Sequence, residues 1–125
     1  MAGVPRVLPV RGVGSVPPTA SAVVANVTVT NPTAGSFVRV TPTGSPPGVT
    51  SNLNVAAGQT TANLVVSEVG ADGSLTFVNA VGATDVVVDV VGYFGPGSGA
   101  RFHAVVPTRV LDDRLGIGAS GPWAG

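Results

Sequence analysis

Hydrophobic and polar residues alternate along most of the chain, and this period of two is typical of β-strands that bury one face. Residues 22–30 show it most clearly: Val or Ala occupies every second position from 23 to 29, while Asn26, Thr28 and Thr30 occupy the positions between. The same alternation recurs at short intervals and predicts about eight or nine short strands. The predicted strands are residues 7–10, 22–30, 36–41, 51–55, 62–67, 74–79, 84–94, 102–106 and 108–111.

Glycine and proline separate these segments. The chain holds 18 Gly and 11 Pro, residues that favour turns. Asn31-Pro32 predicts a turn from which residues 36–41 return, and Gly70-Ala71-Asp72-Gly73 predicts a hairpin leading into residues 74–79. Short strands joined by turns predict an all-β fold, a two-sheet antiparallel β-sandwich with Greek-key or jelly-roll-like connections.

The alternation also predicts which side chains face the core. In residues 36–41, Val38 and Val40 share a face and are expected to point inward. In residues 84–94 the even-numbered valines share one face. Val87 and Val91 lie on the other face beside acidic residues, which indicates that this face is partly covered as well.

The chain has 125 residues, the size of one domain, and we expect residues 1–125 to form a single module. Charged residues make up 10%, against about a quarter in ordinary globular proteins. Thr, Ser, Asn and Gly must therefore cover much of the surface, as in secreted β-proteins.

Charge and cysteine content exclude several classes of partner and site. The formal net charge is zero and Lys is absent, which argues against nucleic acid and against anionic membrane surfaces. No run of eighteen apolar residues occurs, so no membrane insertion as a helix is expected. Without cysteine, disulfides, thiolate zinc sites and cysteine nucleophiles are excluded.

Several motifs occur in a fixed order along nearly the whole chain. They are Asn26-Val27-Thr28-Val29-Thr30-Asn31-Pro32-Thr33-Ala34, Ser51-Asn52-Leu53-Asn54, Gly58-Gln59-Thr60, Ala62-Asn63-Leu64-Val65, Thr84-Asp85-Val86-Val87-Val88-Asp89-Val90, Gly92-Tyr93-Phe94 and Pro107-Thr108-Arg109-Val110-Leu111-Asp112-Asp113-Arg114. This combination resembles the tandem β-rich repeat of large secreted and cell-surface proteins of actinobacteria and other high-GC bacteria. The resemblance implies an extracellular β-rich module without an established catalytic activity. The chain departs from it at Asp113, where the family has threonine.

The resemblance also implies where one repeat meets the next. In tandem copies, a segment like residues 121–125 leads into a strand like residues 7–10. We therefore expect residues 1–20 and 115–125 to link units, and the chain to be one period of a tandem or self-assembling array. Whether Met1 is the native start or the chain is part of a longer one stays open.

Charged residues are densest near the C-terminus, at Arg109, Asp112, Asp113 and Arg114. Adjacent residues of a strand point to opposite faces, so Asp112 and Asp113 are not expected to converge on a substrate or metal. We interpret this cluster as an Arg–carboxylate pair that fastens a loop. We reject the alternative that the protein is a small hydrolase using Asp112 or Asp113. His103 lacks the partners of a zinc site.

The aromatic residues Tyr93, Phe94, Phe102 and Trp123 are expected to anchor the core and interfaces, and the alternative is a sugar-stacking platform. Numerous Asn and Thr side chains could contact glycans, although they more often satisfy turn backbones.

We therefore expect an extracellular structural or adhesive module, without catalytic residues, metal or cofactor, that packs or polymerises with identical subunits or adjacent repeats into a filament or surface layer. The alternative is a carbohydrate- or cell-wall-binding module that recognises cell-wall polysaccharide.

Overall fold

The computed structural model of the protein describes residues 3–96. This part of the chain folds into seven β-strands and contains no helix that is long and apolar enough to cross a membrane. The strands are β1 (Arg6–Pro9), β2 (Ala22–Thr30), β3 (Ser36–Pro42), β4 (Leu53–Val55), β5 (Thr61–Glu68), β6 (Ser74–Asn79) and β7 (Asp85–Phe94). Two further predicted strands, residues 102–106 and 108–111, lie outside the described residues.

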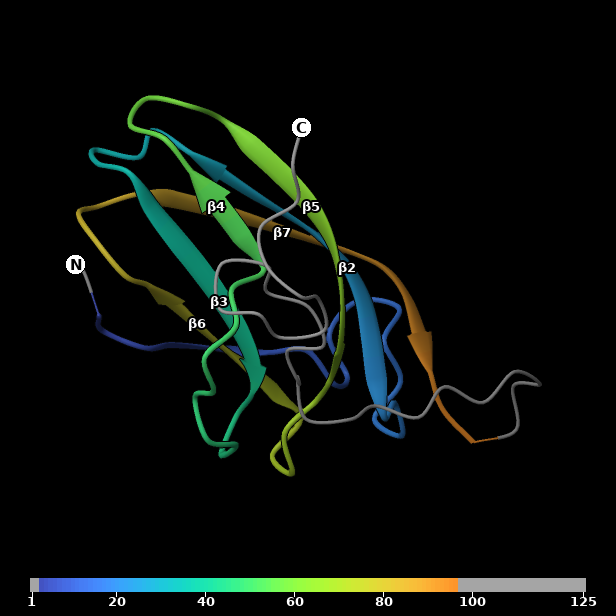
Figure 1. Cartoon of the computed structure of the whole chain (residues 1–125). Helices are drawn as coiled ribbons and strands as arrows, with labels where there is room; N and C mark the ends of the chain where they lie inside the picture. Colours follow the sequence, from blue (N-terminus) through green and yellow to red (C-terminus); the bar gives the residue numbers. More distant parts are fainter. Residues whose placement is uncertain (1–2, 97–125) are drawn as a thin grey trace, which may run out of the picture.

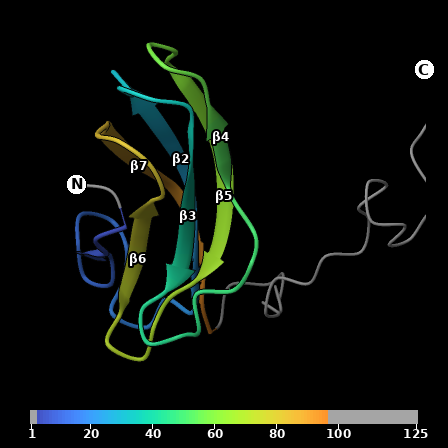
Figure 2. The ribbon, with the colours of Figure 1, turned by 60° about the vertical axis from the view of Figure 1, so that its left-hand side comes forward.

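The strands form two antiparallel sheets that pack face to face (Figures 1 and 2). One sheet has the order β1-β6-β3-β4 and the other has the order β5-β2-β7. The prediction of an all-β, two-sheet antiparallel sandwich is therefore confirmed.

The core lies between the sheets and consists mainly of valine. Val23, Ala25, Val27 and Val29 of β2 are all buried, as the alternation predicts. The opposite sheet contributes buried side chains from β3, β4 and β6: Val38, Val40, Leu53, Val55, Leu75 and Phe77. Burying a side chain of this size contributes roughly 1.5–3 kcal/mol relative to exposure.

The predicted hairpins are wrong, although the turns lie where they were expected. β5 pairs with β2, whereas β6 pairs with β1 and β3, so Gly70–Gly73 joins strands of different sheets. The turn after β2 likewise leads into the opposite sheet. Turn residues specify a reversal of direction, but the return strand joins the sheet that buries its apolar face, here with Val69 buried between the layers.

Asparagine side chains connect the strands through backbone groups. Asn52 accepts a hydrogen bond from the Val40 N–H (2.7 Å) and donates its own N–H to the Val38 carbonyl (2.9 Å). Asn63 of β5 donates to the Asn52 carbonyl at 2.8 Å, which links the two sheets. Asn31 adopts a positive φ of 52°, a conformation that Asn tolerates better than most residues.

Close packing at Gly70 provides a test of the crossing between β5 and β6. A Cβ at this position would overlap the Thr43 carbonyl oxygen and lie 2.8 Å from the Thr43 nitrogen, so the backbone has to move. We expect Gly70→Ala to lower the free energy of unfolding by about 2 kcal/mol, measured by urea denaturation. Gly35→Ala is the control, because its Cβ would lie 3.8 Å from the Val55 oxygen, and it should change stability by less than about 0.5 kcal/mol. Equal effects of the two substitutions would contradict this packing.

Candidate functional site

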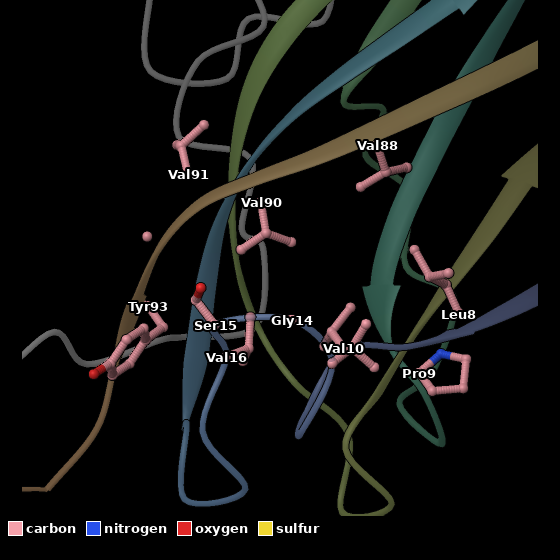
Figure 3. Close-up of a pocket in the computed structure, with 12 residues that line it drawn as sticks. Leu8, Pro9, Val10, Gly14, Ser15, Val16, Val88, Val90, Val91 and Tyr93 are labelled. Atoms are coloured by element: carbon pink, nitrogen blue, oxygen red, sulfur yellow. The ribbon is translucent and has the colours of Figure 1, made fainter.

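The edge strands β1 and β7 border an apolar groove, here called the β1–β7 seam (Figure 3). Its volume is about 590 Å³. Leu8 and Val10 reach it from the four-stranded sheet and the loop that follows, and Val88, Val90 and Tyr93 reach it from β7. Figure 3 shows Val88 and Val90 on the side of β7 that faces Leu8 and Val10, whereas Val91 lies on the opposite side of the strand.

The seam exists because burial decreases sharply from the inner strands to these two edges. Leu75 of β6 is 1% exposed, but Leu8, its partner on β1, is 36% exposed. Ala25 of β2 is 2% exposed, but Val90, its partner on β7, is 37% exposed. Paired residues in antiparallel strands share a face, so Leu8 and Val90 both point toward the interior and remain incompletely covered.

The loop after β1 forms one end of the seam and is fixed by Arg11. The Arg11 Nε donates to the buried Ala20 carbonyl at 2.7 Å, and a terminal nitrogen donates to the Ala71 carbonyl at 3.3 Å. The Val10 and Arg11 N–H groups both donate to the Gly73 carbonyl. Sequence reasoning missed Arg11. Its signal was its position as the single charged residue between Arg6 and Arg39.

The seam lining is suited to packing and offers little for acid–base chemistry. Its side-chain polar groups are the hydroxyls of Ser15 and Tyr93, and its other lining residues are apolar or glycine. Asp85 and Asp89 lie on the outer side of β7, opposite Thr30 and Asn26. No group of three or more His, Cys, Asp and Glu side chains within residues 3–96 could hold a metal ion.

A second apolar surface lies on the outer face of the sheet β5-β2-β7. Its exposed members are Leu64 and Val66 of β5 and Val87 and Val91 of β7, and we call these four residues the outer apolar face. Val91 is 66% exposed, and it stands where a β-bulge shifts the register between β2 and β7. We expected Val87 and Val91 to be partly covered, but within the described residues both side chains are exposed.

Two of the predicted interface residues lie in the described part of the chain. Tyr93 pairs with the buried Val23, faces the seam and is 45% exposed. Phe94 is half-buried, and its carbonyl accepts hydrogen bonds from the Ser21 N–H (2.7 Å) and Oγ (3.0 Å). The other predicted site residues lie outside the described residues: Phe102, His103, Arg109, Asp112, Asp113, Arg114 and Trp123.

Comparison of the chain with family models, with curated proteins and with solved structures finds no match.

The role of Arg11 in holding the seam loop can be tested by Arg11→Met, which keeps the aliphatic stem and removes the donors. Because the buried Ala20 carbonyl then loses its side-chain partner, we expect the free energy of unfolding to fall by about 1–2 kcal/mol, measured by urea denaturation. Arg6→Met on the exposed strand β1 is the control and should change stability by less than about 0.5 kcal/mol. The interpretation fails if Arg11→Met unfolds at the same urea concentration as the control.

Proposed function

We propose that the chain is an extracellular structural or adhesive module that packs with identical neighbours through the outer apolar face and so forms a larger array. The observation that carries the proposal is the exposure of Leu64, Val66, Val87 and Val91 together on one side of one sheet. Soluble monomers seldom expose contiguous apolar patches of large size, and such patches commonly mark interaction surfaces.

The strand register brings most of this surface together. Val66 of β5 lies opposite Val24 of β2, which in turn lies opposite Gly92 of β7, next to Val91. The glycine leaves no side chain between Val24 and Val91, so the apolar surface continues across all three strands. An outward apolar face of this type can pack against a second sheet at the roughly 10 Å spacing of a β-sandwich.

Polar positions within the face favour a defined contact over unspecific aggregation. Asn26 and Asp89 are paired in the register and stand between Leu64 on one side and the edge of β7 on the other. An unpaired carboxylate is costly to bury. A neighbour must therefore either leave Asp89 at the solvated margin of the contact or supply a hydrogen-bond donor, and this requirement restricts the possible alignments.

Composition supports the extracellular and associative parts of the proposal. The surface relies on Thr, Ser, Asn and Gly rather than on charge, and the formal net charge of zero provides no long-range repulsion between copies. A contact of the face with itself builds a two-fold dimer, whereas its contact with a different surface builds rings or filaments.

The proposal is tested by the double substitution Val66→Thr/Val91→Thr in the full chain. Threonine keeps the β-branched shape and strand preference of valine but adds a hydroxyl that favours water. We expect the wild-type chain to self-associate with increasing concentration, and the variant to associate at least about tenfold more weakly, an effect of roughly 1.4 kcal/mol or more. Sedimentation velocity measures the association, and negative-stain microscopy shows the form of the array.

The matched control is Val49→Thr/Val81→Thr, which makes the same chemical change at two exposed valines outside the strands. It should associate like the wild type. A wild-type chain that stays monomeric at high concentration would contradict the proposal, as would equal association of the two double variants. Retention of a monomeric wild-type chain on insoluble cell-wall polysaccharide would instead favour the carbohydrate-binding alternative.

A further inference from the structure

Within residues 3–96, the two sheets of the sandwich differ by one strand. The sheet β1-β6-β3-β4 has four strands and the sheet β5-β2-β7 has three. At one side of the sandwich β5 contacts both β3 and β4 across the core. At the other side the three-stranded sheet ends at β7, so no strand within residues 3–96 lies beyond β7 to face β1 (Figures 1 and 2).

The consequence is visible in the inward-facing side chains of β7. Val86 and Val90 are 39% and 37% exposed, whereas their partners on β2, Val29 and Ala25, are 0% and 2% exposed. The inward-facing side chains are therefore fully covered at β2 but only partly covered at β7. One more strand beside β7 would lie over Leu8 and would complete a four-on-four sandwich.

The free edge of β7 is itself suited to accept a strand. β7 runs from Asp85 to Phe94 and is rich in valine, and within residues 3–96 β2 is the only strand that pairs with it. Long apolar edge strands are usually paired or covered in native proteins, because their unpaired backbone groups and apolar side chains promote unspecific pairing. β7 contains no lysine or proline, the residues that commonly protect an edge.

The chain itself supplies a segment of the right kind. It continues from β7 into a glycine-rich stretch, Gly95-Pro96-Gly97-Ser98-Gly99, and then into Phe102-His103-Ala104-Val105-Val106. A strand that follows β7 through such a connector can return antiparallel along the free edge. A tethered segment is also present at an effective concentration in the millimolar range for short linkers, which favours it over the same segment of a neighbour.

We propose that residues 102–111 occupy the β1–β7 seam of their own chain and pair with the free edge of β7 as a fourth strand of the sheet β5-β2-β7. Phe102, Ala104 and Val106 share one face of this segment and enter the seam, because the alternate face carries the imidazole of His103. Pro107 fits this position, since a strand added there is an edge strand and one missing N–H is tolerated. The proposal does not depend on the outer apolar face, which lies on the other side of the sheet.

Paired cysteines in the full chain test the proposal, and the sequence contains no native cysteine to interfere. Val88→Cys on the seam side of β7 is combined in turn with Phe102→Cys, Ala104→Cys or Val106→Cys. A disulfide requires Cα atoms within about 4.4–6.8 Å. We expect one of these three pairs to form an intrachain disulfide under mild oxidation, detected by mass spectrometry and non-reducing electrophoresis.

The control is Val87→Cys with the same three partners, because Val87 is one residue away on the same strand but on its outer face. These pairs should form the bond at least about tenfold more slowly. Equal yields in both series would overturn the proposal, and so would the absence of any disulfide. Bonds formed only between chains would overturn it as well, because they place the segment of a second copy in the seam.

Hydrogen–deuterium exchange of the unmodified full chain provides a second test that requires no substitution. In residues 102–106 the alternate amides that donate to β7, and in β7 the amides that point away from β2, should exchange at least about 100-fold more slowly than in an unstructured peptide. A lack of protection at every amide of residues 102–106 would overturn the proposal. Repeating the measurement on Val66→Thr/Val91→Thr separates this result from self-association, because protection should persist there even if the outer apolar face plays no part in assembly.

Discussion

Burial of the inner face of β2 is the interaction on which the rest of the fold depends. β2 is the central strand of its sheet, hydrogen-bonded to β5 and β7, and its four inward side chains are nearly inaccessible to solvent. They face the buried valines and Leu75 of the other sheet. The chain contains no cysteine, and this apolar contact joins the two layers together with the hydrogen bond from Asn63 to the Asn52 carbonyl.

Alternation in the sequence predicted the strands and their buried faces well, because a period of two has a direct physical cause. Val23 to Val29 and the pair Val38 and Val40 lie as predicted. The pairing of the strands was harder to predict from the sequence. Gly70–Gly73 indicates a turn, but nothing local states that β5 pairs with β2 and that β6 pairs with β1 and β3. Strand pairing depends on contacts between residues that are distant in sequence, and local residue patterns do not specify these contacts.

For the same reason, the candidate surfaces could be predicted only in part from the sequence. Tyr93 was expected to anchor an interface, and it faces the seam. The seam follows from the unequal number of strands that residues 3–96 contribute to the two sheets, which is a property of topology. In the sequence, Leu64 and Val66 look like ordinary strand residues. They are exposed because they lie on the outer side of their sheet. The role of Arg11 depends on its partners, the Ala20 and Ala71 carbonyls, which lie 9 and 60 residues away in the sequence.

The pairing of β1 with β6 constrains the order in which the chain can fold. Leu8 near the N-terminus pairs with Leu75. β1 therefore cannot pair with β6 until most of the sandwich has been synthesised. Until β1 and β6 have paired, the edge of β6 that β1 covers has open backbone groups. In an array of like units, the β1 strand of a neighbour could pair there first, and folding would then exchange strands between units. In the proposed array, each sandwich therefore has to close on its own β1 for neighbouring units to remain distinct.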